Sequence, residues 1–570
     1  MNSRWVNHQT DANLRLMAEV LNVSETVARI MANRGIRTKN TALAFLRTSI
    51  DNLRPFAEMK DAKKALARIS AAIRNGEKVT IYGDYDADGI CSTAILQRVL
   101  TRLGANVTYY IPHRIYEGYG LNINAISQVA QEGTTLIIAV DNGISAIAEV
   151  AHAAALGVDV VIIDHHEQGA QLPAAVAIID PKQHECPYPF KEMCAGGLSF
   201  KLATALCEYM GMPFTERDEM LVLASIATVC DIVPAKDENR IFAYCGMVVL
   251  NSNKLINPGF GSLLTVRGYL EKPIDTFAVG FVLGPCINAA GRLDSANVAV
   301  DLLLEIDITK RMQLVQRLIA LNDERKQITA DCVERLLANL PKELDKVIVI
   351  VDTQTHESLA GIVAGRIREA TGRPTIVITP GESGMKGSGR SSDCYNLFEA
   401  LSANAHLLTR FGGHAKAAGL TIAEENIPIL RESLNRDCTL TEEDFLPVLQ
   451  IDAELNLCDV TIPLANELAR LAPFGSGNHE PLFVTYGLQV QNVRIMDEKN
   501  TLIFTFSDGS GRGVKGIAFG LNEIYAQVTE AAHVDKNGGF CMDVVYVVEL
   551  NIFNGSASVQ MRVKDFKVTI

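Results

Sequence analysis

The chain has 570 residues, which is too long for a single hydrophobic core and implies about three to four domains. Its composition, 48% hydrophobic and 21% charged, excludes a disordered chain, and its net charge of −13 argues against blanket electrostatic binding to nucleic acid. The N-terminal segment is broken by polar residues and no uninterrupted apolar stretch is long enough for a bilayer, so a cytoplasmic location is expected.

Residues 1–75 are predicted to form an N-terminal helical cap, because apolar residues recur at helical spacing in DANLRLMAEVLN and DAKKALARISAAIRNG. From Lys78 onward, short apolar strands alternate with helices, as in KVTIYG, NVTYYI, TTLIIAV and VDVVIID. This alternation predicts an α/β domain over residues 76–295, with helices on both faces of a parallel sheet. Such sheets bind ligands beyond the carboxyl ends of their strands.

Three further segments follow. A long, strongly charged helix over residues 296–340 is predicted to connect two lobes. The segments KVIVIVD, LAGIVAGRIREATG and PTIVIT predict a second, smaller α/β domain over residues 341–440. Alternating strands such as LQVQNVRIM, TLIFTFSD and DVVYVVEL predict a small closed β-barrel over residues 450–570.

Polar clusters follow three of the predicted parallel strands. They consist of Asp84, Asp86 and Asp88, then Asp141, then Asp164, His165 and His166. Because parallel strands end at one edge of a sheet, these clusters are expected to converge, with Asp231 in SIATVCDIVPAK as a further candidate. Crowded carboxylates resist burial unless a cation compensates them, and mixed oxygen and imidazole ligands suit manganese and tolerate magnesium.

Two such ions about 3.5 to 4 Å apart could share a carboxylate, activate water and stabilise the leaving oxygen of a phosphoryl group. Each motif alone has an ordinary alternative. DYDADG could be a calcium-binding turn or a solvated loop, DNG a simple turn, and Asp231 a helix end. Their joint occurrence at strand ends favours the metal site.

Eight blocks of this sequence resemble the DHH phosphoesterase superfamily, named for the triplet Asp164-His165-His166, and within it the RecJ family of exonucleases specific for single-stranded DNA. The blocks are GDYDADGICSTA, IPHRIYEGYGL, AVDNGIS, IIDHHE, INAAGRLDSA, KGSGRSS, FGGHAKAAG and LAPFGSGNHEPLF. They occur in the order of that family. The resemblance implies a DHH domain, a DHH-associated domain and a C-terminal OB fold.

The resemblance also implies roles for the clustered residues. The metal ligands are expected to be Asp84, Asp86, Asp88, Asp141, His165 and Asp231, with Asp141 bridging and Asp84 additional or alternate. With Asp88, His166 is expected to act in catalysis by stabilising charge on the scissile phosphate or protonating the leaving oxygen, while Asp164 orients an imidazole. Several relatives have a histidine at the position of Tyr82, which makes one metal position different here.

Contacts to nucleic acid are expected in both lobes. The resemblance assigns them to Arg114, Asn288, Arg292, Ser388, Arg390, Gly412, Gly413 and His414. The glycines have an alternative interpretation as tight turns. RecJ proteins often have an arginine where this chain has Cys286, and its loss is expected to weaken the grip on the strand or change the preferred end chemistry.

The OB fold is expected to bind single strands by base stacking within a basic groove. Its candidate residues are Arg494, Lys499, Arg512 and Lys515, among Phe504, Phe506 and Phe519. An alternative interpretation makes the phenylalanines core residues and the basic side chains ordinary surface.

The resemblance thus implies a metal-dependent exonuclease that degrades single-stranded DNA from the 5′ end to mononucleotides, in DNA repair and recombination. It would use Mn²⁺ or Mg²⁺, two ions in all, with a helicase and a single-strand-binding protein as candidate partners. One alternative is a DHH-family oligoribonuclease or nucleotide phosphatase, which would not need the barrel and the cap. Another is a non-catalytic DNA-binding replication scaffold, against which the retained metal ligands argue.

Overall fold

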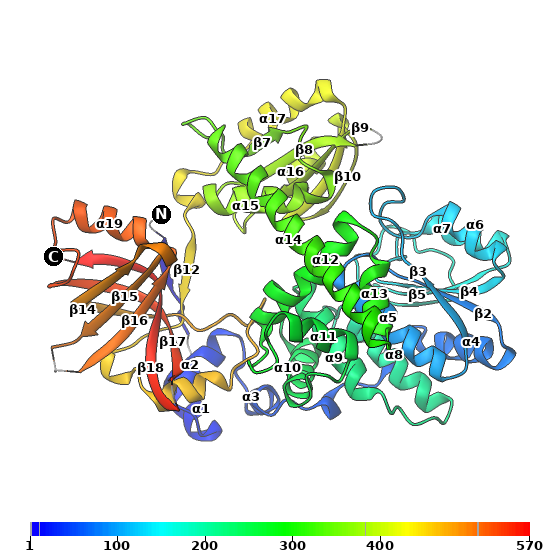
Figure 1. Ribbon diagram of the computed structural model, residues 1–570, viewed down its shortest axis with the longest axis horizontal. Coiled ribbons are helices and arrows are strands. Elements are labelled where there is room, and N and C mark those ends of the chain that lie inside the picture. Colours follow the sequence, from blue (N-terminus) through cyan, green and yellow to red (C-terminus); the bar gives the residue numbers. More distant parts are fainter. Residues whose placement is uncertain (1–2, 11, 382–383, 510–511, 554, 570) are drawn as a thin grey trace. The chain divides into compact units, whose positions relative to one another are not determined.

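The structure is a computed structural model that describes residues 3–10, 12–381, 384–509, 512–553 and 555–569 (Figure 1). Its contacts divide the chain into two compact units. One unit comprises Met1–Arg47 and Thr441–Ile570, and the other comprises Thr48–Leu440. Among the helices in the described ranges, none has both the length and the apolar character needed to cross a bilayer.

The larger unit begins with an α/β lobe whose sheet has five parallel strands in the order β3-β2-β4-β5-β6. The strands are β2 (Lys78–Tyr82), β3 (Asn106–Tyr110), β4 (Thr134–Val140), β5 (Asp159–Ile163) and β6 (Ala177–Ile179). Its helices are α4 (Ala62–Asn75), α5 (Ala87–Arg102), α6 (Ile123–Gln131), α7 (Ile147–Ala155), α8 (Ala195–Tyr209), α9 (Arg217–Cys230), α10 (Asp237–Ser252) and α11 (Pro258–Val266). The α/β domain with a parallel sheet that the sequence predicts is confirmed.

Helices cover both faces of this sheet, which is why its strands are continuous apolar runs. Val79 and Ile81 of β2 belong to the core that α4, α5 and α8 share. Tyr82 points to the opposite face and packs with Ile126 of α6 and Ala153 of α7. The carboxyl ends of the strands therefore stay free to carry a site.

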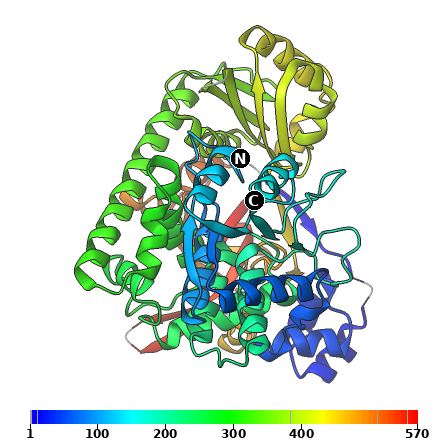
Figure 2. The same cartoon turned by 90° about the vertical axis from the view of Figure 1, so that its right-hand side faces the viewer.

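The segment predicted as one connecting helix contains two helices. It follows the π-helix η3 (Ala278–Leu283) and α12 (Gly284–Leu293), and it consists of α13 (Asn297–Leu304) and α14 (Ile308–Ala338). The chain is extended at Glu305, and the carboxylate of Asp307 accepts a hydrogen bond of 2.9 Å from the amide of Lys310. This capping interaction starts a separate helix. The long α14 leads to the second lobe (Figure 2).

The second lobe has a five-stranded sheet in the order β10-β11-β9-β8-β7, in which only β7 and β8 are parallel. Its strands are β7 (Ile348–Val351), β8 (Thr375–Gly381), β9 (Gly384–Arg390), β10 (Leu408–His414) and β11 (Ala417–Ile422). Its helices are α15 (Ala360–Thr371), α16 (Leu397–Ala403) and α17 (Ile427–Arg436). Separate apolar clusters cover the two faces of the sheet.

The smaller unit joins the two ends of the chain. Its strands are β1 (Arg4–Asn7), β12 (Val448–Ile451), β13 (Ala453–Glu454), β14 (Phe483–Met496), β15 (Thr501–Ser507), β16 (Gly513–Phe519), β17 (Phe540–Phe553) and β18 (Ser556–Thr569). Its helices are α1 (Leu14–Leu21), α2 (Glu25–Asn33), α3 (Lys39–Leu46), α18 (Ile462–Ala469) and α19 (Asn522–Ala531). The pairings run β14-β15-β16-β18-β17 and return to β14.

The N-terminal segment differs from the helical cap expected for residues 1–75. It begins with a strand, since β1 pairs in parallel with β12. Val27, Ile30 and Met31 of α2 share an apolar core with the strands of the smaller unit. Ile69 of α4 instead packs against the parallel sheet. Residues 1–47 and 48–75 therefore belong to different compact units.

Candidate active site

Carboxylates and imidazoles meet at the carboxyl edge of the parallel sheet. Asp141 directly follows β4, and His165 follows β5 by two residues. The Nε2 atom of His165 lies 3.1 Å from Oδ1 of Asp141, 3.5 Å from Oδ2 of Asp88 and 3.8 Å from Oδ2 of Asp231. Side chains that are far apart in the sequence thus form one cluster.

Within the described part of the chain, three groups of side chains have ligand atoms within 4.8 Å of one another. The groups are Asp141 with His165 and His166, Asp88 with His165 and Asp231, and Asp84 with Asp86 and Asp141. Asp141 and His165 each belong to two groups, which suits a pair of cations that share a ligand. Every residue predicted as a metal ligand lies in one of these groups.

Helix starts hold two of the aspartates in place. Asp86 is the N-cap of α5, and its Oδ1 accepts hydrogen bonds from the amides of Asp88 (2.9 Å) and Gly89 (3.2 Å). The carboxylate of Asp88 accepts the amides of Ala195 (2.8 Å) and Gly196 (2.7 Å) at the start of α8. The positive end of a helix dipole favours an anion at this position.

The electrostatics of the cluster call for positive charge. Burial and the charges of neighbouring carboxylates raise the pKa values of Asp84, Asp141 and Asp231 well above their usual range, and raise that of Asp88 to about 7. The buried Oδ1 of Asp84 has no hydrogen-bond partner among the described residues. Divalent cations would offset the repulsion and supply that missing partner, so the donor set fits a metal centre.

The pKa values of the two histidines are shifted in opposite directions. Burial and the neighbouring His166 lower the pKa of His165 to about 3, which leaves a neutral imidazole suited to metal binding. For His166, burial favours the neutral form, but the hydrogen bond of 2.6 Å from its Nδ1 to Oδ1 of Asp164 raises its pKa to about 9. Burial likewise opposes ionisation of Asp164, yet this bond brings its pKa to about 2. Asp164 thereby orients a charged imidazole.

Backbone geometry is unusual at two of the cluster positions. Asp141 has φ +64°, and Ile232, directly after Asp231, has φ +59°. A β-branched residue in this left-handed region is strained, and such strain is concentrated at functional sites. The turns that place Asp141 and Asp231 in the cluster therefore include backbone conformations of raised energy.

Tyr82, the position at which this sequence is expected to depart from several relatives, is a packing residue. It is fully buried, and its hydroxyl donates to the carbonyl oxygen of Gly120 (3.3 Å) and accepts from Nδ2 of Asn122 (3.2 Å). Its ring lies 5.1 Å from that of Tyr110. The hydroxyl thus forms hydrogen bonds with residues 120 and 122, on the face of the sheet that α6 and α7 cover.

Sequence reasoning missed Asp180, which follows β6 at the same edge of the sheet. The residue is 1% exposed, and its Oδ2 lacks a hydrogen-bond partner within the described ranges. Burial, followed by the charge of Asp164, raises its pKa to about 8. The strand-end rule that selected the other aspartates also applies to Asp180 and could have found it.

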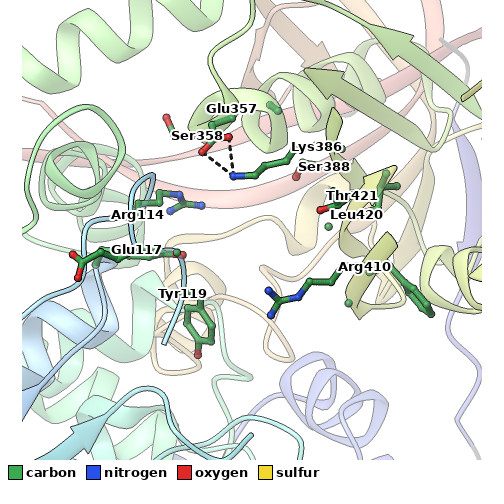
Figure 3. A pocket seen from close by; sticks show the side chains of 17 residues that line it. Arg114, Glu117, Tyr119, Glu357, Ser358, Lys386, Ser388, Arg410, Leu420 and Thr421 are labelled. Carbon is green, nitrogen blue, oxygen red and sulfur yellow. Dashed lines mark hydrogen bonds and ion pairs between the residues drawn. The ribbon is translucent and has the colours of Figure 1, made fainter. Parts of the chain in front are cut away.

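A cavity of about 570 Å³ is lined by both lobes of the larger unit (Figure 3). Arg114 reaches it from the loop after β3, Lys386 from β9 and Arg410 from β10. Lys386 pairs with Glu357 at 3.0 Å, whereas Arg410 is exposed. Sequence reasoning missed Lys386 and Arg410, because only the tertiary fold brings them beside Arg114. Converging cations of this kind suit a phosphate.

Two further arginines lie close to this cavity. Arg390 donates to the carbonyl oxygen of Gly389 (2.8 Å) and lies near Oγ of Ser388, a cavity residue. Arg292 of α12 donates to the carbonyl oxygen of Ser358 (2.9 Å). Burial, followed by the charge of Arg114, lowers the pKa of Arg390 and brings that of Arg292 to about 9. A bound anion would offset the repulsion between these guanidinium groups and stabilise their charged forms.

Of the other residues predicted to contact nucleic acid, some lie at the cavity or the surface and others have a structural role. Gly412 lines the cavity and His414 is exposed at the end of β10. Gly413 has φ +136°, and a Cβ there would overlap the carbonyl oxygen of Ala417, so the turn itself needs glycine. Oδ1 of Asn288 accepts the amide of Ala87 (2.8 Å), which ties α12 to the first turn of α5.

Cys286, where RecJ proteins often have an arginine, is buried. Its sulfur lies 3.4 Å from a terminal guanidinium nitrogen of Arg267 and 3.4 Å from Nδ2 of Asn322 on α14. Asn288, on the same helix, instead contacts Ala87. Cys286 therefore lies in the packing between α12 and α14.

We predict that Gly291→Ala weakens both stability and activity. A Cβ at Gly291 would overlap the carbonyl oxygen of Tyr85, so α12 would have to move and strain the bond from Ala87 to Asn288. We expect the free energy of unfolding, measured by urea denaturation, to fall by about 1 to 3 kcal/mol. Gly280→Ala is the control, since its Cβ would lie 3.7 Å from the nearest atom, in Val229. Unchanged stability and kcat in Gly291→Ala would contradict the prediction.

The basic and aromatic residues of the C-terminal domain agree only in part with the predicted stacking surface. Phe504 and Phe506 are fully buried in the core, so the prediction that they stack on bases is wrong. Arg512 donates to the carbonyl oxygens of Cys458 (3.0 Å) and Val460 (2.8 Å), so it is at least partly structural. Phe519 is exposed. Alternation along β15 places Phe504 and Phe506 on the same inner face.

Comparisons with known domains agree with this architecture. Residues 78–228 match the DHH family N-terminal domain, residues 344–439 match the DHHA1 domain, and residues 451–565 match the RecJ OB domain. The fold and the acidic site therefore define a DHH-family protein with an attached DHHA1 domain.

Individual relatives narrow the assignment. The chain is 36% identical to the single-stranded-DNA-specific exonuclease RecJ of Bacillus subtilis (strain 168), across 99% of this chain and 71% of that protein. It is 33% identical to the Escherichia coli (strain K12) protein of the same name, across 94% of each. The crystal structure of RecJ in complex with Mn²⁺ from Thermus thermophilus matches with a TM-score of 0.84 at 28% identity, covering 99% of this chain and 79% of that one. The chain belongs to the RecJ family of single-stranded-DNA-specific exonucleases.

Proposed function

We propose that this protein is a metal-dependent exonuclease that hydrolyses single-stranded DNA from its 5′ end and releases mononucleotides. The observation that carries the proposal is the combination of two neighbouring features in one unit. Carboxylates and imidazoles gather at the strand ends, and a cavity lined by Arg114, Lys386 and Arg410 lies between the lobes of that unit. Their charges match cations and a phosphate.

The proposed metal ligands are Asp84, Asp86, Asp88, Asp141, His165 and Asp231. RecJ from Thermus thermophilus has been solved in complex with Mn²⁺ and in complex with Mg²⁺, and either ion suits this donor set. When bound, a pair of such ions supplies Lewis acidity for the attacking water and for the leaving oxygen. Asp141, present in two of the groups, is the proposed shared ligand.

His166 is the proposed donor to the reacting phosphate. Asp164 fixes its ring through Nδ1, and the hydroxyl of Tyr119 lies 3.3 Å from that nitrogen and donates to the carbonyl oxygen of Asp141 (3.0 Å). An oriented imidazole can stabilise charge on a phosphate oxygen or give a proton to the leaving oxygen. Tyr119 would keep the loop after β3 next to the cluster.

The cavity is proposed to hold the 5′-terminal nucleotide. Its volume of about 570 Å³ lies in the usual range for small-molecule sites. Arg390 is proposed to bind a phosphate through two parallel hydrogen bonds, with Arg114 and Arg410 adding positive charge. Because these contacts neutralise phosphates, binding should weaken as salt concentration rises.

We also propose a cytoplasmic role in DNA repair and recombination, beside a helicase and a single-strand-binding protein. An enzyme that needs single strands depends on a partner that separates duplex DNA. All 12 cysteines are free thiols, which is usual in a reducing compartment.

Metal removal provides the direct test. Purified protein with Mn²⁺ is given long single strands labelled at either end, a blunt duplex, short RNA and pyrophosphate. We expect rapid release of the 5′ label as a mononucleotide, abolished by EDTA and restored by added Mn²⁺. Digestion confined to short RNA or pyrophosphate would favour an oligoribonuclease or nucleotide phosphatase. Binding of single strands without any cleavage would favour a scaffold.

A further inference from the structure

Two exposed phenylalanines stack on each other at the surface of the larger unit. The ring centroids of Phe277 and Phe281 are 5.1 Å apart and their planes differ by 23°. The residues are 61% and 69% exposed. A single exposed apolar side chain is ordinary, but two adjacent aromatic rings in water forgo the gain of burial and mark a contact surface.

The pair lies on a segment that is tied to the metal cluster. Phe281 is within the π-helix η3, and Phe277 directly precedes it; π-helical turns are frequent at functional sites. A Cβ on Gly280 would lie 3.7 Å from Val229, and a Cβ on Gly284 would overlap the sulfur of Cys230. Because Cys230 directly precedes Asp231, η3 packs against the end of the helix that presents this ligand.

The same segment continues into the helix that contacts the metal loop. The α12 helix begins at Gly284, directly after η3, and carries Asn288 and Arg292. Asn288 holds the amide of Ala87 in the first turn of α5. The segment that carries the aromatic pair therefore contacts the end of α9 beside Asp231, and it continues into α12, which contacts the first turn of α5 beside Asp86 and Asp88.

We propose that Phe277 and Phe281 form a stacking platform for bases of the single strand as it leaves the metal cluster. This inference rests on the proposed function. Aromatic rings bind every base through its π-face, so such a platform holds a strand without selecting sequence.

A protein partner is the other occupant that an apolar pair could have. The near-parallel rings and the continuity with Asp231 favour a nucleic acid, because the strand must pass this cluster to be cut. The two occupants make different demands on the side chains. A protein surface would accept aliphatic groups of similar size, whereas base stacking requires aromatic rings.

The test compares three double variants of Phe277 and Phe281, with alanine, leucine or tyrosine at both positions. With long single strands and Mn²⁺, we expect KM to rise about tenfold for the alanine and leucine variants, with kcat within about twofold of wild type. The tyrosine variant should keep the wild-type KM. Tyr209→Ala, an exposed aromatic on α8, is the matched control and should change neither constant.

A binding measurement separates stacking from catalysis. In the Asp141→Asn background, a strand carrying 2-aminopurine should be quenched by the wild-type pair and by the tyrosine variant, and not by the alanine variant. An unchanged KM and unchanged quenching in a folded alanine variant would overturn the proposal, as would full rescue by leucine. A fall in kcat without a rise in KM would assign the pair to support of Asp231 instead. If the wild-type protein cut no single strand, the proposed function would fail, and the quenching would still decide on the platform.

Discussion

Replacing Asp141 by asparagine is expected to lower kcat on single-stranded DNA by at least about a thousandfold. Asp141 belongs to two of the carboxylate–histidine groups and lies 3.1 Å from His165, so its charge serves the whole cluster. Asparagine keeps the shape of the side chain and tolerates the left-handed backbone at φ +64°, which preserves the fold. The measurement is kcat with saturating Mn²⁺, together with thermal unfolding.

The control for this variant is Glu208→Gln, which removes a carboxylate from an exposed position on α8. It should leave kcat and Mn²⁺ binding unchanged. Calorimetry should show that Asp141→Asn also binds fewer Mn²⁺ ions than the wild-type protein. If the folded variant kept more than about a tenth of the wild-type kcat, Asp141 could not be the shared ligand.

Strands with a 5′-phosphate are expected to be cut faster than strands with a 5′-hydroxyl, and replacing Arg390 by lysine is expected to remove most of that difference. Arg390 contacts Ser388, a residue of the cavity wall, and a Cβ on Gly361 would overlap its guanidinium. Lysine keeps the charge but cannot form two parallel hydrogen bonds to a phosphate. A charge-assisted hydrogen bond is worth about 1.5 to 3 kcal/mol, so kcat/KM for phosphorylated strands should fall by about tenfold to a hundredfold.

The measurement compares kcat/KM on strands with a 5′-phosphate and with a 5′-hydroxyl. Arg366→Lys provides the matched control, since Arg366 is on α15 but is exposed and paired with Glu369. It should leave both values unchanged. An equal loss on both kinds of strand in Arg390→Lys would mean that Arg390 grips the strand elsewhere than at its terminal phosphate.

Much of the site could be predicted because its residues follow a local rule. A buried parallel strand is a short apolar run, and the first polar residues after it must lie at the carboxyl edge of the sheet. Asp84, Asp141 and His165 are found in this way without knowledge of how the strands are ordered. The rule does not predict Asp231, because this residue follows a helix instead of a strand.

Other parts depend on contacts between segments that are distant in the sequence. The parallel pair of β1 with β12 joins Arg4 to Val448, and no local pattern reports such a partner. Lys386 and Arg410 lie on antiparallel strands of the second lobe. Alternation along such a strand predicts which residues share a face of the sheet, but it does not predict which other segment that face contacts. For Phe504, the sequence offered an exposed stacking role or a core role, and only burial decided for the core.

The two roles of the larger unit are encoded in separate stretches of the chain. The groups suited to metal lie between Asp84 and Asp231, whereas the second lobe's share of the cavity lies between Glu357 and Thr421, beyond the 31-residue helix α14. Under the proposed function, substitutions in the later stretch are expected to change which strand ends are accepted while the metal requirement stays the same. The proposed function thus separates the choice of substrate end from the hydrolytic chemistry along the sequence.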